Sequence, residues 1–345
     1  MADVTLLVGD GGAWKGWTGV TVHKSLEAVA HSFELELTDR TPRQPALRLG
    51  PGLTCALGMD GQIALSGYLD EVSQDYGRDA HTVRITGRSP AGDFVDCDCV
   101  PPWEYAGLTL TEVVTRLIAP FGPSVVTETD VGEPFERFTI NPGDTVWSVI
   151  ERGCRLRGVL AITDPVDGLN LVLTRAGCGG AAPVGLRLGV NILKGAGRRS
   201  WAGRFSQYLA LGQQENRDRV SAAQAAGPSA TLSDGEINRY RPKVLVAEGQ
   251  GDGVTLRERA AWQRAVAKAK SERLSYSVQG WTAGPGGPLW RPNWMVEVTD
   301  DFLGVSGTRL IAAVTLTLDR SQGSLTTLEL VPPDAYLPAP GGQES

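Results

Sequence analysis

The sequence lacks long apolar runs, has few cysteines and histidines, and carries no excess of positive charge. No apolar run approaches the ~18 residues of a membrane-spanning helix, so we expect no membrane insertion by this chain. The first residues, MADVTLLVGDGG, lack a basic segment followed by a long apolar one, which predicts no secretory signal. The net charge of -6 argues against a protein that coats nucleic acid, because such surfaces are normally basic.

The cysteines give no sign of a disulfide framework or a metal site. They are odd in number and scattered, at Cys55, Cys97, Cys99, Cys154 and Cys178. This pattern predicts reduced thiols. The pair at 97 and 99 is too close for a relaxed bridge and has no histidine or second cysteine pair nearby, so we expect no bound metal.

Catalytic motifs are also missing. The three histidines, His23, His31 and His81, belong to no nucleophile or metal-binding motif, and GRSPAG at 87–92 is not a G-x-S-x-G elbow. No phosphate-binding loop or dinucleotide fingerprint is present. We therefore expect no enzyme activity and no cofactor. The carboxylates include enough candidates for an acid/base pair that a cell-wall hydrolase stays open as an alternative.

What the sequence does contain is many turns and short strands. Its 345 residues include 43 glycines and 21 prolines, which predicts several β-rich units rather than long helices. Asp60-Gly61 indicates a hairpin turn, and alternation over 33–37 indicates a half-buried strand. Six strands in the first 90 residues fit a small β-barrel or sandwich; we place them at 4–8, 16–24, 32–38, 53–57, 63–73 and 81–86.

Residues 96–185 change to a mixed α+β pattern. Thr109 and Glu112 have capping-box spacing, and the helix they open is stopped by Pro120. Asp144 is expected to cap a second helix that ends near Leu156, with Gly158 as a left-handed C-cap and a hairpin after it. GDTVWS at 143–148 resembles the start of a LysM peptidoglycan-binding repeat. A capped helix start with a core tryptophan explains the same residues, so both interpretations are open.

Strand patterns return after residue 186 and surround one long helix. We expect strands at 205–211, 243–247, 294–299, 308–318 and 324–331, an exposed loop at 212–230, and a tail from 332 that is disordered at its end. The helix is predicted over 252–274, with Thr255 as N-cap and Glu258 completing a capping box. Trp262 lies on its apolar face and basic residues cover much of the rest.

A Gly/Pro-rich turn, GWTAGPGGPLWRPN at 280–293, follows this helix and a short strand. Trp281, Trp290 and Trp294 fall within or next to it. Tryptophan is usually buried, which favours a packed turn, but it is also enriched at protein interfaces. Either interpretation makes these three residues and Trp262 candidate structural or interface anchors rather than catalytic groups.

Taken in order, short motifs along nearly the whole chain resemble the central baseplate hub proteins of Mu-like contractile-tailed phages. No single motif is decisive; their collinear order carries the resemblance. The motifs are GWTGVTV at 16–22, SLE at 25–27, SFEL at 32–35, GYLD at 67–70, GR at 87–88, DFVDC at 93–97, RYRP at 239–242, GW at 280–281 and LWRPN at 289–293.

The resemblance implies a ring-shaped homotrimer, related to the hub of T-even phages and to the N-terminal part of type VI secretion spike proteins. The implied fold is α+β and β-rich, with two tail-tube-like antiparallel β-barrels per subunit and inserted α+β domains. The implied divisions are a first barrel at 1–95, an α+β domain at 96–185, a split second barrel at 186–235 plus 294–337, an inserted strand-helix-strand block at 236–293, and a disordered tail at 338–345.

The same resemblance implies a structural function in the virion tail baseplate. Such a hub adapts the sixfold tail tube to the threefold membrane-piercing spike and leaves a central channel for DNA, which is only passing cargo. Its partners would be its own copies, the spike, the tube and other baseplate proteins, after synthesis in the bacterial host cytoplasm. The alternatives are a tail-associated cell-wall hydrolase and a LysM-like peptidoglycan-binding protein.

Overall fold

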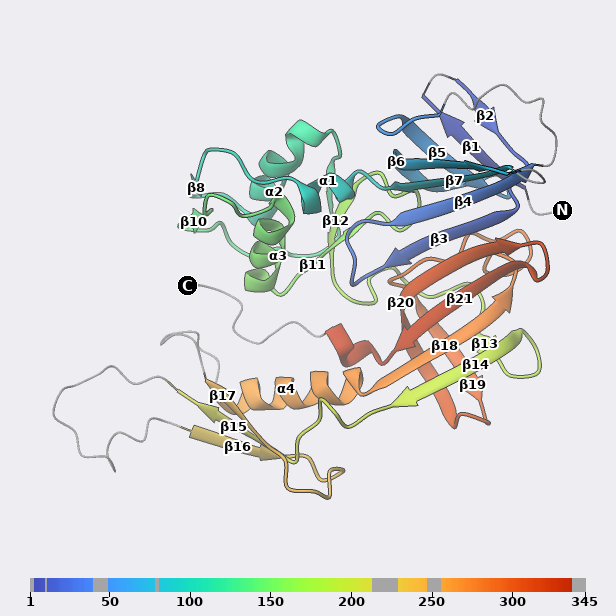
Figure 1. Ribbon diagram of the computed structural model, residues 1–345. Coiled ribbons are helices and arrows are strands. Elements are labelled where there is room, and N and C mark those ends of the chain that lie inside the picture. The colour runs from blue at the N-terminus through green and yellow to red at the C-terminus, as the bar shows by residue number, and fades with distance from the viewer. Residues whose placement is uncertain are drawn as a thin grey trace.

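A computed structural model describes residues 3–9, 11–39, 49–77, 81–212, 229–246 and 256–336. Four parts are visible: two halves of one large sheet, an α+β domain beside the first half, and an arm that projects from the second (Figure 1). Within the described ranges no helix is long and apolar enough to cross a membrane. The predicted loop at 213–228, the proposed cap Thr255, the side chain of Glu258 and the tail beyond residue 336 lie outside the described part.

The first half of the large sheet is antiparallel. Its strands run in the order β3-β4-β7-β6-β5-β1-β2. Asp60 and Gly61 both have positive φ, at 49° and 80°, and form the predicted turn between β5 and β6. The bounds are β1 Val4–Val8, β2 Ala13–Trp14, β3 Gly19–Ser25, β4 Ser32–Asp39, β5 Thr54–Met59, β6 Gln62–Tyr76 and β7 His81–Arg88.

The second half continues the same sheet without a break, because β20 pairs with β3 through partners such as Leu316 and Val22. From there the order runs β20-β21-β18-β14, while β19 pairs with β20 and β13 pairs with β19. The bounds are β13 Leu186–Arg187, β14 Ile192–Arg199, β18 Glu272–Gln279, β19 Met295–Asp300, β20 Val305–Asp319 and β21 Gly323–Val331.

This topology corrects the expected pair of closed barrels. In the described residues the strands expected to form the two barrels instead belong mainly to one open, 13-stranded sheet. The path of this sheet ends at β14 and at β2. The cores of the two halves are also one cluster, which runs from Leu6 and Leu57 to Trp281 and Leu328. The β-rich α+β class is as predicted, but the two halves share a core instead of closing separately.

The α+β domain packs two helices against a three-stranded sheet. Thr109 and Glu112 make the predicted capping box at the start of α2, and Gly158 closes α3 in the left-handed conformation. Thr145, not Asp144, caps α3; Asp144 instead accepts hydrogen bonds from the Asn141 amide and from Arg152. The bounds are α1 Ala91–Asp96, β8 Glu104–Tyr105, α2 Leu110–Ile118, the 3-10 turn η1 Ala119–Phe121, β9 Val125–Thr127, β10 Phe138–Thr139, α3 Val146–Arg157, β11 Leu160–Thr163 and β12 Leu171–Thr174.

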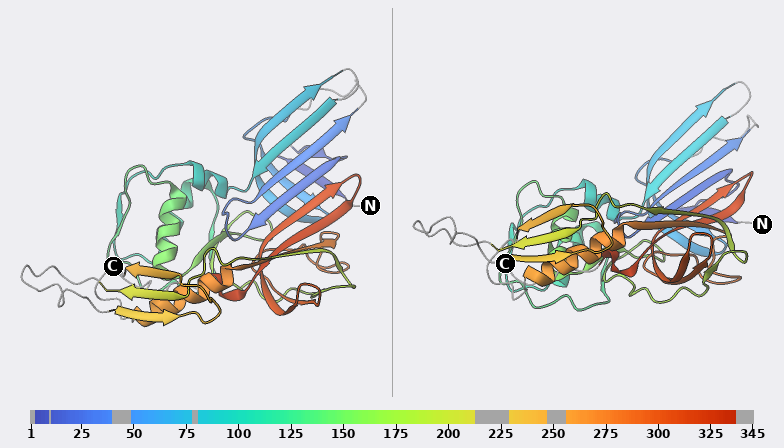
Figure 2. Two further views of the ribbon diagram at one scale, coloured as in Figure 1. Left: turned by 60° about the horizontal axis from the view of Figure 1, so that its bottom comes forward. Right: turned by 90° about the horizontal axis from the view of Figure 1, so that it is seen from below.

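The arm is a small sheet covered on one face by the long helix. Its strand order is β16-β15-β17, and the views in Figures 1 and 2 place α4 along one side of it. The helix is shorter than predicted, since Glu272, Arg273 and Leu274 already belong to β18. The bounds are β15 Gln207–Leu211, β16 Ser229–Ser233, β17 Pro242–Val246 and α4 Leu256–Lys270; the 3-10 turn η2, Pro333–Tyr336, packs against α4. The predicted domain boundary at 235/236 therefore falls inside this sheet.

Candidate functional site

The tryptophan turn, residues 280–294, fills the junction between the two halves of the large sheet. Gly280 leaves β18 with φ of 76°, and the indole N–H of Trp281 then donates to the Thr317 carbonyl at 2.9 Å. The Trp290 amide donates to the Trp281 carbonyl at 3.0 Å, which closes the turn. The rings of Trp290 and Trp294 meet edge to face, with centroids 6.3 Å apart.

Two amides tie this turn to other parts of the chain. Gln62, at the start of β6, donates to the Gly287 carbonyl at 3.0 Å and accepts from the Leu289 amide. Asn293 has φ of 69°; its side chain accepts from the Gly177 amide and donates to the Arg175 carbonyl. The turn therefore links the first half of the sheet, the second half, and the chain that leaves the α+β domain.

The three indoles of this turn are buried inside the subunit. Trp281, Trp290 and Trp294 are 0%, 2% and 3% exposed, and all belong to the shared core. Trp262 lies half-buried on α4. The geometry gives the three turn residues a packing role within one chain; whether any of the four anchors an interface stays a prediction.

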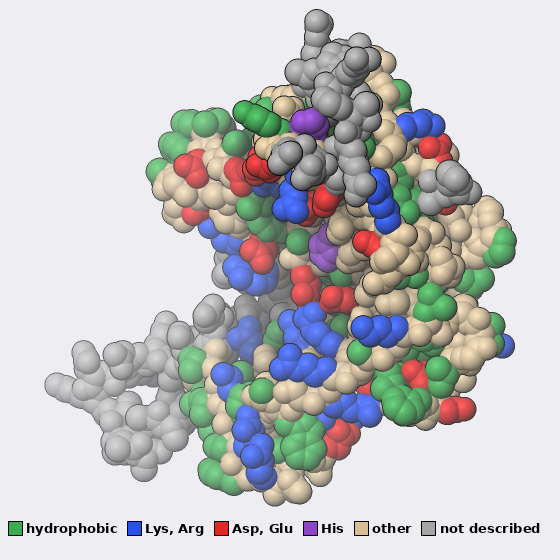
Figure 3. Space-filling model, turned by 45° about the vertical axis from the view of Figure 1, so that its right-hand side comes forward, with side chains coloured by type: hydrophobic (Ala, Val, Ile, Leu, Met, Phe, Trp, Pro, Cys, Tyr) green, Lys and Arg blue, Asp and Glu red, His purple; other side chains and the backbone are tan. Residues whose placement is uncertain are grey.

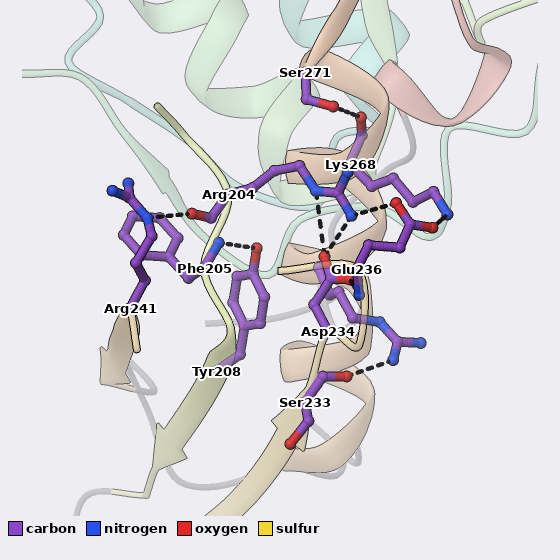
Figure 4. Close-up of polar contacts among 10 residues, drawn as sticks. Arg204, Phe205, Tyr208, Ser233, Asp234, Glu236, Arg241, Lys268 and Ser271 are labelled. Carbon is purple, nitrogen blue, oxygen red and sulfur yellow. Dashed lines mark hydrogen bonds and ion pairs between the residues drawn. The ribbon is translucent and has the colours of Figure 1, made fainter. Parts of the chain in front are cut away.

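The arm is held by a network of charges rather than by a large core. Its core is small: Tyr208 and Ala210 from β15 meet Ala260 and Ala267 from α4. Arg204 is 5% exposed at its side chain and donates to Asp234 at 2.7 Å and to Glu236 at 2.8 Å (Figure 4). Ion pairs with Lys268 and then with Arg204 hold the pKa of Glu236 below its usual value.

Three basic residues of α4 and the start of β18 have partners within the chain. Arg264 donates to the Ser233 carbonyl at 3.0 Å, and Lys268 pairs with Glu236. Arg273 pairs with Glu27 at 2.7 Å, and the Tyr336 hydroxyl donates to the same carboxylate. Arg264 and Lys268 connect α4 to the end of β16 and the turn after it, and Arg273 connects β18 to the first half of the large sheet, so all three are structural struts.

A buried polar junction joins β3 to the β11–β12 hairpin. Lys24 is 1% exposed, and its ammonium donates to the Pro165 and Val166 carbonyls, both at 2.9 Å. Burial lowers the pKa of Lys24 to about 8, and the charges of Asp164 and Asp167 oppose that shift. His31 is also fully buried, and burial, followed by the charge of Lys24, lowers its pKa well below the usual value.

No arrangement suited to catalysis or metal binding occurs among the described residues. They contain no group of three histidine, cysteine or carboxylate side chains placed to hold a metal. All five cysteines are free, with Cys97 and Cys178 exposed. His23 contacts Thr315, and His31 is enclosed by the core. The LysM-like stretch is the capped start of α3, with Val146 buried in the domain core.

Sequence reasoning missed several residues that hold these sites together. Gln62, Asn293, Lys24 and Arg204 have ordinary sequence neighbours, and their partners are 30 or more residues away in most of these contacts. Of these four residues, only Asn293 could have been singled out from its residue type, because asparagine tolerates the left-handed backbone conformation that it adopts here.

Comparison with known proteins assigns the chain to a family. Three parts of the chain match family models, described as Mu phage baseplate assembly protein GpP-like, N-terminal (residues 3–89), baseplate hub protein gp44-like, second domain (91–175), and Mu phage baseplate assembly protein GpP, fourth domain (253–339). Baseplate hub protein gp44 of Escherichia phage Mu is 29% identical over 346 residues, covering 98% of this chain and 90% of the relative.

The solved structures decide the assignment. The 43 kDa tail protein of prophage MuSo2 from Shewanella oneidensis is 33% identical, with a TM-score of 0.84 over 98% of this chain and 100% of that one. The chain belongs to the Mu-like phage baseplate hub family. A tail protein of Neisseria meningitidis is 23% identical with a TM-score of 0.80, covering 99% of each chain, and shares the fold. This baseplate hub protein is therefore a structural component of a Mu-like virion tail.

A more distant likeness extends the fold beyond phages. An Escherichia coli type VI secretion component, described as similar to the T4 tail proteins gp27 and gp5, has a TM-score of 0.59 at 11% identity. It covers 95% of this chain and 76% of that one, and at this identity it shows the fold alone. This chain and that secretion-system component thus share one β-rich architecture.

Proposed function

We propose that this hub protein forms a closed homotrimeric ring that adapts the sixfold tail tube to the threefold spike. The observation that carries this proposal is the open, 13-stranded sheet with two halves and, in the described residues, a free edge at each end, β14 and β2. A subunit with two different free edges makes head-to-tail contacts, and such contacts close into a ring when the rotation fits. Each half then acts as one tail-tube-like lobe, so three subunits present six.

The partners follow from this arrangement. We propose the tail tube on one side of the ring, the spike on the other, further baseplate proteins around it, and DNA only as cargo passing through the channel. Arg264, Lys268 and Arg273 are already paired within the chain, so they would attract DNA phosphates only weakly. This supports the proposal that DNA passes through the channel without being bound. Assembly would follow synthesis in the host cytoplasm.

The domain division predicted from the sequence also stays a proposal. It gives a first β-rich domain at residues 1–95, the α+β domain at 96–185, a second β-rich domain at 186–235 with 294–337, an inserted block at 236–293 and a tail at 338–345. Limited proteolysis tests it, since domain boundaries are the preferred sites of cleavage.

Light scattering and imaging of the purified protein test the ring. A mass three times that of the 36.7 kDa chain, together with rings of threefold symmetry in negative-stain averages, is expected. A single-chain mass at micromolar concentration, unchanged by adding the spike, would refute the proposal. No described feature favours a wall hydrolase, and the LysM-like stretch is used to start α3.

A further inference from the structure

The two halves of the large sheet repeat one five-strand arrangement. In the first half the strands run β3-β4-β7-β6-β5, and in the second they run β14-β18-β21-β20-β19. Neighbours are antiparallel in both sets, and the strands in equivalent places follow the same order along the chain. The arm is inserted after the first strand of the second set.

The repeat extends to single residues. β6 and β20 are both 15 residues long, with a bulge directly after Leu69 in one and after Ile311 in the other. The amides of Gly52 and Asn293 donate to the carbonyls of these two residues at 2.8 and 2.9 Å, and both donors have positive φ. The two sets therefore align residue by residue, so a contact made by one predicts a contact for the other.

One such contact joins the two halves inside the subunit. β3 pairs with the part of β20 beyond its bulge, from Ala313 to Asp319, and places Val22 beside Leu316 in the shared core. This side of β20 is open to β3 because β19 pairs with β20 only up to Leu310.

The equivalent contact is not made within the subunit. The counterpart of β3 is β14, which in the described residues pairs only with β18, apart from one bridge between Leu188 and Ile192. The counterpart of the outer part of β20 is the segment 71–76 of β6. Since β5 pairs with β6 only up to Tyr68, one side of this segment has no partner strand among the described residues. Figure 1 shows β6 and β14 at opposite ends of the row of strands between them, so their meeting requires two copies of the chain.

The repeat also gives the register. One row of paired residues starts after the bulge of β6 and crosses the sheet through Glu71, Thr86, Glu34, Thr21 and Thr317. The matching row starts after the bulge of β20 and runs through Ala313, Glu329, Ser275 and Ala196, where the sheet ends. Thr317 lies four residues past Ala313, so the missing partner of Ala196 is the residue four past Glu71, which is Asp75.

The two unpaired segments carry opposite charges. β14 is exposed along seven of its eight residues and includes Lys194 and Arg198, while Glu71 and Asp75 are exposed on β6. None of these four makes an ion pair within the described residues. Residues 186–293 hold 17 of the 33 lysines and arginines but only 8 of the 39 aspartates and glutamates, and blue side chains accordingly gather over the lower part of the molecule in Figure 3. A basic edge thus fits an acidic one.

We propose that β14 of one subunit pairs antiparallel with the outer part of β6 of the next, in the register of the β3–β20 junction. This inference rests on the proposed ring and names the strands that close it, with β6 rather than β2 as the partner of β14. Ala196 then lies beside Asp75, and Arg198 lies beside Ser73, diagonally between Glu71 and Asp75. Side chains of opposite charge at such positions on one face stabilise an antiparallel pair.

The opposite face of the contact gives Tyr76 a place. This side chain is 89% exposed in the single subunit. The register puts it beside Gly195, which has no side chain, so the ring extends across β14 toward Tyr276. A Cβ at Gly195 would lie only 3.0 Å from the Tyr276 ring, which already covers that position. The paired Tyr76 thus extends the shared core of the neighbouring subunit.

Disulfide formation tests the pairing and its register together. In a background of Cys97→Ser and Cys178→Ser, which removes the exposed thiols, the chain carries Ala196→Cys and Asp75→Cys. Directly opposed residues of an antiparallel pair have Cα atoms about 4.5–5.5 Å apart, a separation that a disulfide bridges. Mild oxidation of the ring is therefore expected to give a covalent trimer on a non-reducing gel. The matched control replaces Asp75→Cys by Gln74→Cys, an exposed neighbour on the opposite face, and is expected to give about tenfold less product.

Charge reversal then tests the assigned contact. Adding Arg198→Glu to the cysteine chain is expected to lower the yield of covalent trimer about fivefold, because the new carboxylate lies next to Glu71. Adding Glu71→Arg to the same chain is expected to restore most of the yield. Arg320→Glu, the same change in the exposed turn between β20 and β21, should leave it unchanged.

The outcomes separate the contact from the ring. A trimer by light scattering that gives no more product with Asp75→Cys than with Gln74→Cys would overturn the strand pairing and leave the ring intact. Disulfide-linked chains longer than three subunits would support the pairing and refute the ring. A monomer without product would overturn both, and a yield that Arg198→Glu leaves unchanged would overturn the assigned charge contact.

Discussion

Removing the Trp281 side chain is expected to be one of the most costly single truncations in this chain. The indole is 0% exposed and lies in the core that the two halves of the sheet share. Trp→Ala at a buried site costs about 3–5 kcal/mol, because the cavity that it leaves collapses only in part. Loss of the N–H donor to the Thr317 carbonyl adds roughly 1 kcal/mol.

Urea unfolding, followed by circular dichroism at one fixed protein concentration, measures the effect. The control is Trp201→Ala, which removes the same side chain from a site that is 39% exposed, and it is expected to cost under about 1 kcal/mol. Trp281→Phe keeps most of the ring but not the hydrogen bond, so its midpoint should fall between the two. Equal midpoints for the two alanine variants would show that the turn does not hold the shared core together.

Three further predictions rest on charges. Lys24 has a pKa of about 8 in the fold against its usual 10.5, so between these pH values the unfolded chain binds more protons. The unfolding free energy of the wild type relative to Lys24→Met should therefore rise by about 3 kcal/mol over that window, and a constant difference would refute the assignment. Arg204→Met leaves Asp234 buried without its partner and should cost about 3–5 kcal/mol, seen as faster amide exchange across β15–β17, whereas Arg239→Met should leave that exchange unchanged. The purified protein should bind double-stranded DNA weakly; tight binding that falls steeply with salt in a filter or anisotropy assay would contradict the strut role of the α4 cations.

The features that sequence predicts well in this chain are those whose cause is local. The Thr109–Glu112 capping box, the Asp60-Gly61 turn and the Gly158 C-cap each depend on residues within three or four positions of one another. The N-cap of α3 was misplaced by one residue because Asp144 and Thr145 are both good caps. Asp144 instead accepts from the Asn141 amide, three residues before it, and from Arg152, eight residues on.

The joining of the two halves has no local cause. β3 pairs with β20, almost 300 residues away, and a hydrophobic strand pattern is compatible with many partners. The run Leu310–Val314 is buried on both faces, with Ile311 and Val314 in the shared core and Leu310 and Ala312 in a second cluster with α4 and the β11–β12 hairpin. Such a run marks a central strand, but it does not identify the neighbour, so two closed barrels and one open sheet could not be told apart from the sequence.

The net charge also hides how unevenly the charged residues are distributed along the chain. A value of -6 argues against a surface that coats nucleic acid, yet half of the positive charge lies in fewer than a third of the residues. What a cation can do is decided by whether the fold gives it a partner. Arg204 and Lys268 form ion pairs that stabilise the arm, Arg273 joins β18 to Glu27, and the Lys243 ammonium lies over the Phe205 ring. Net charge and sequence position do not reveal these partners; only the fold shows which cations are already paired and therefore stabilise the subunit.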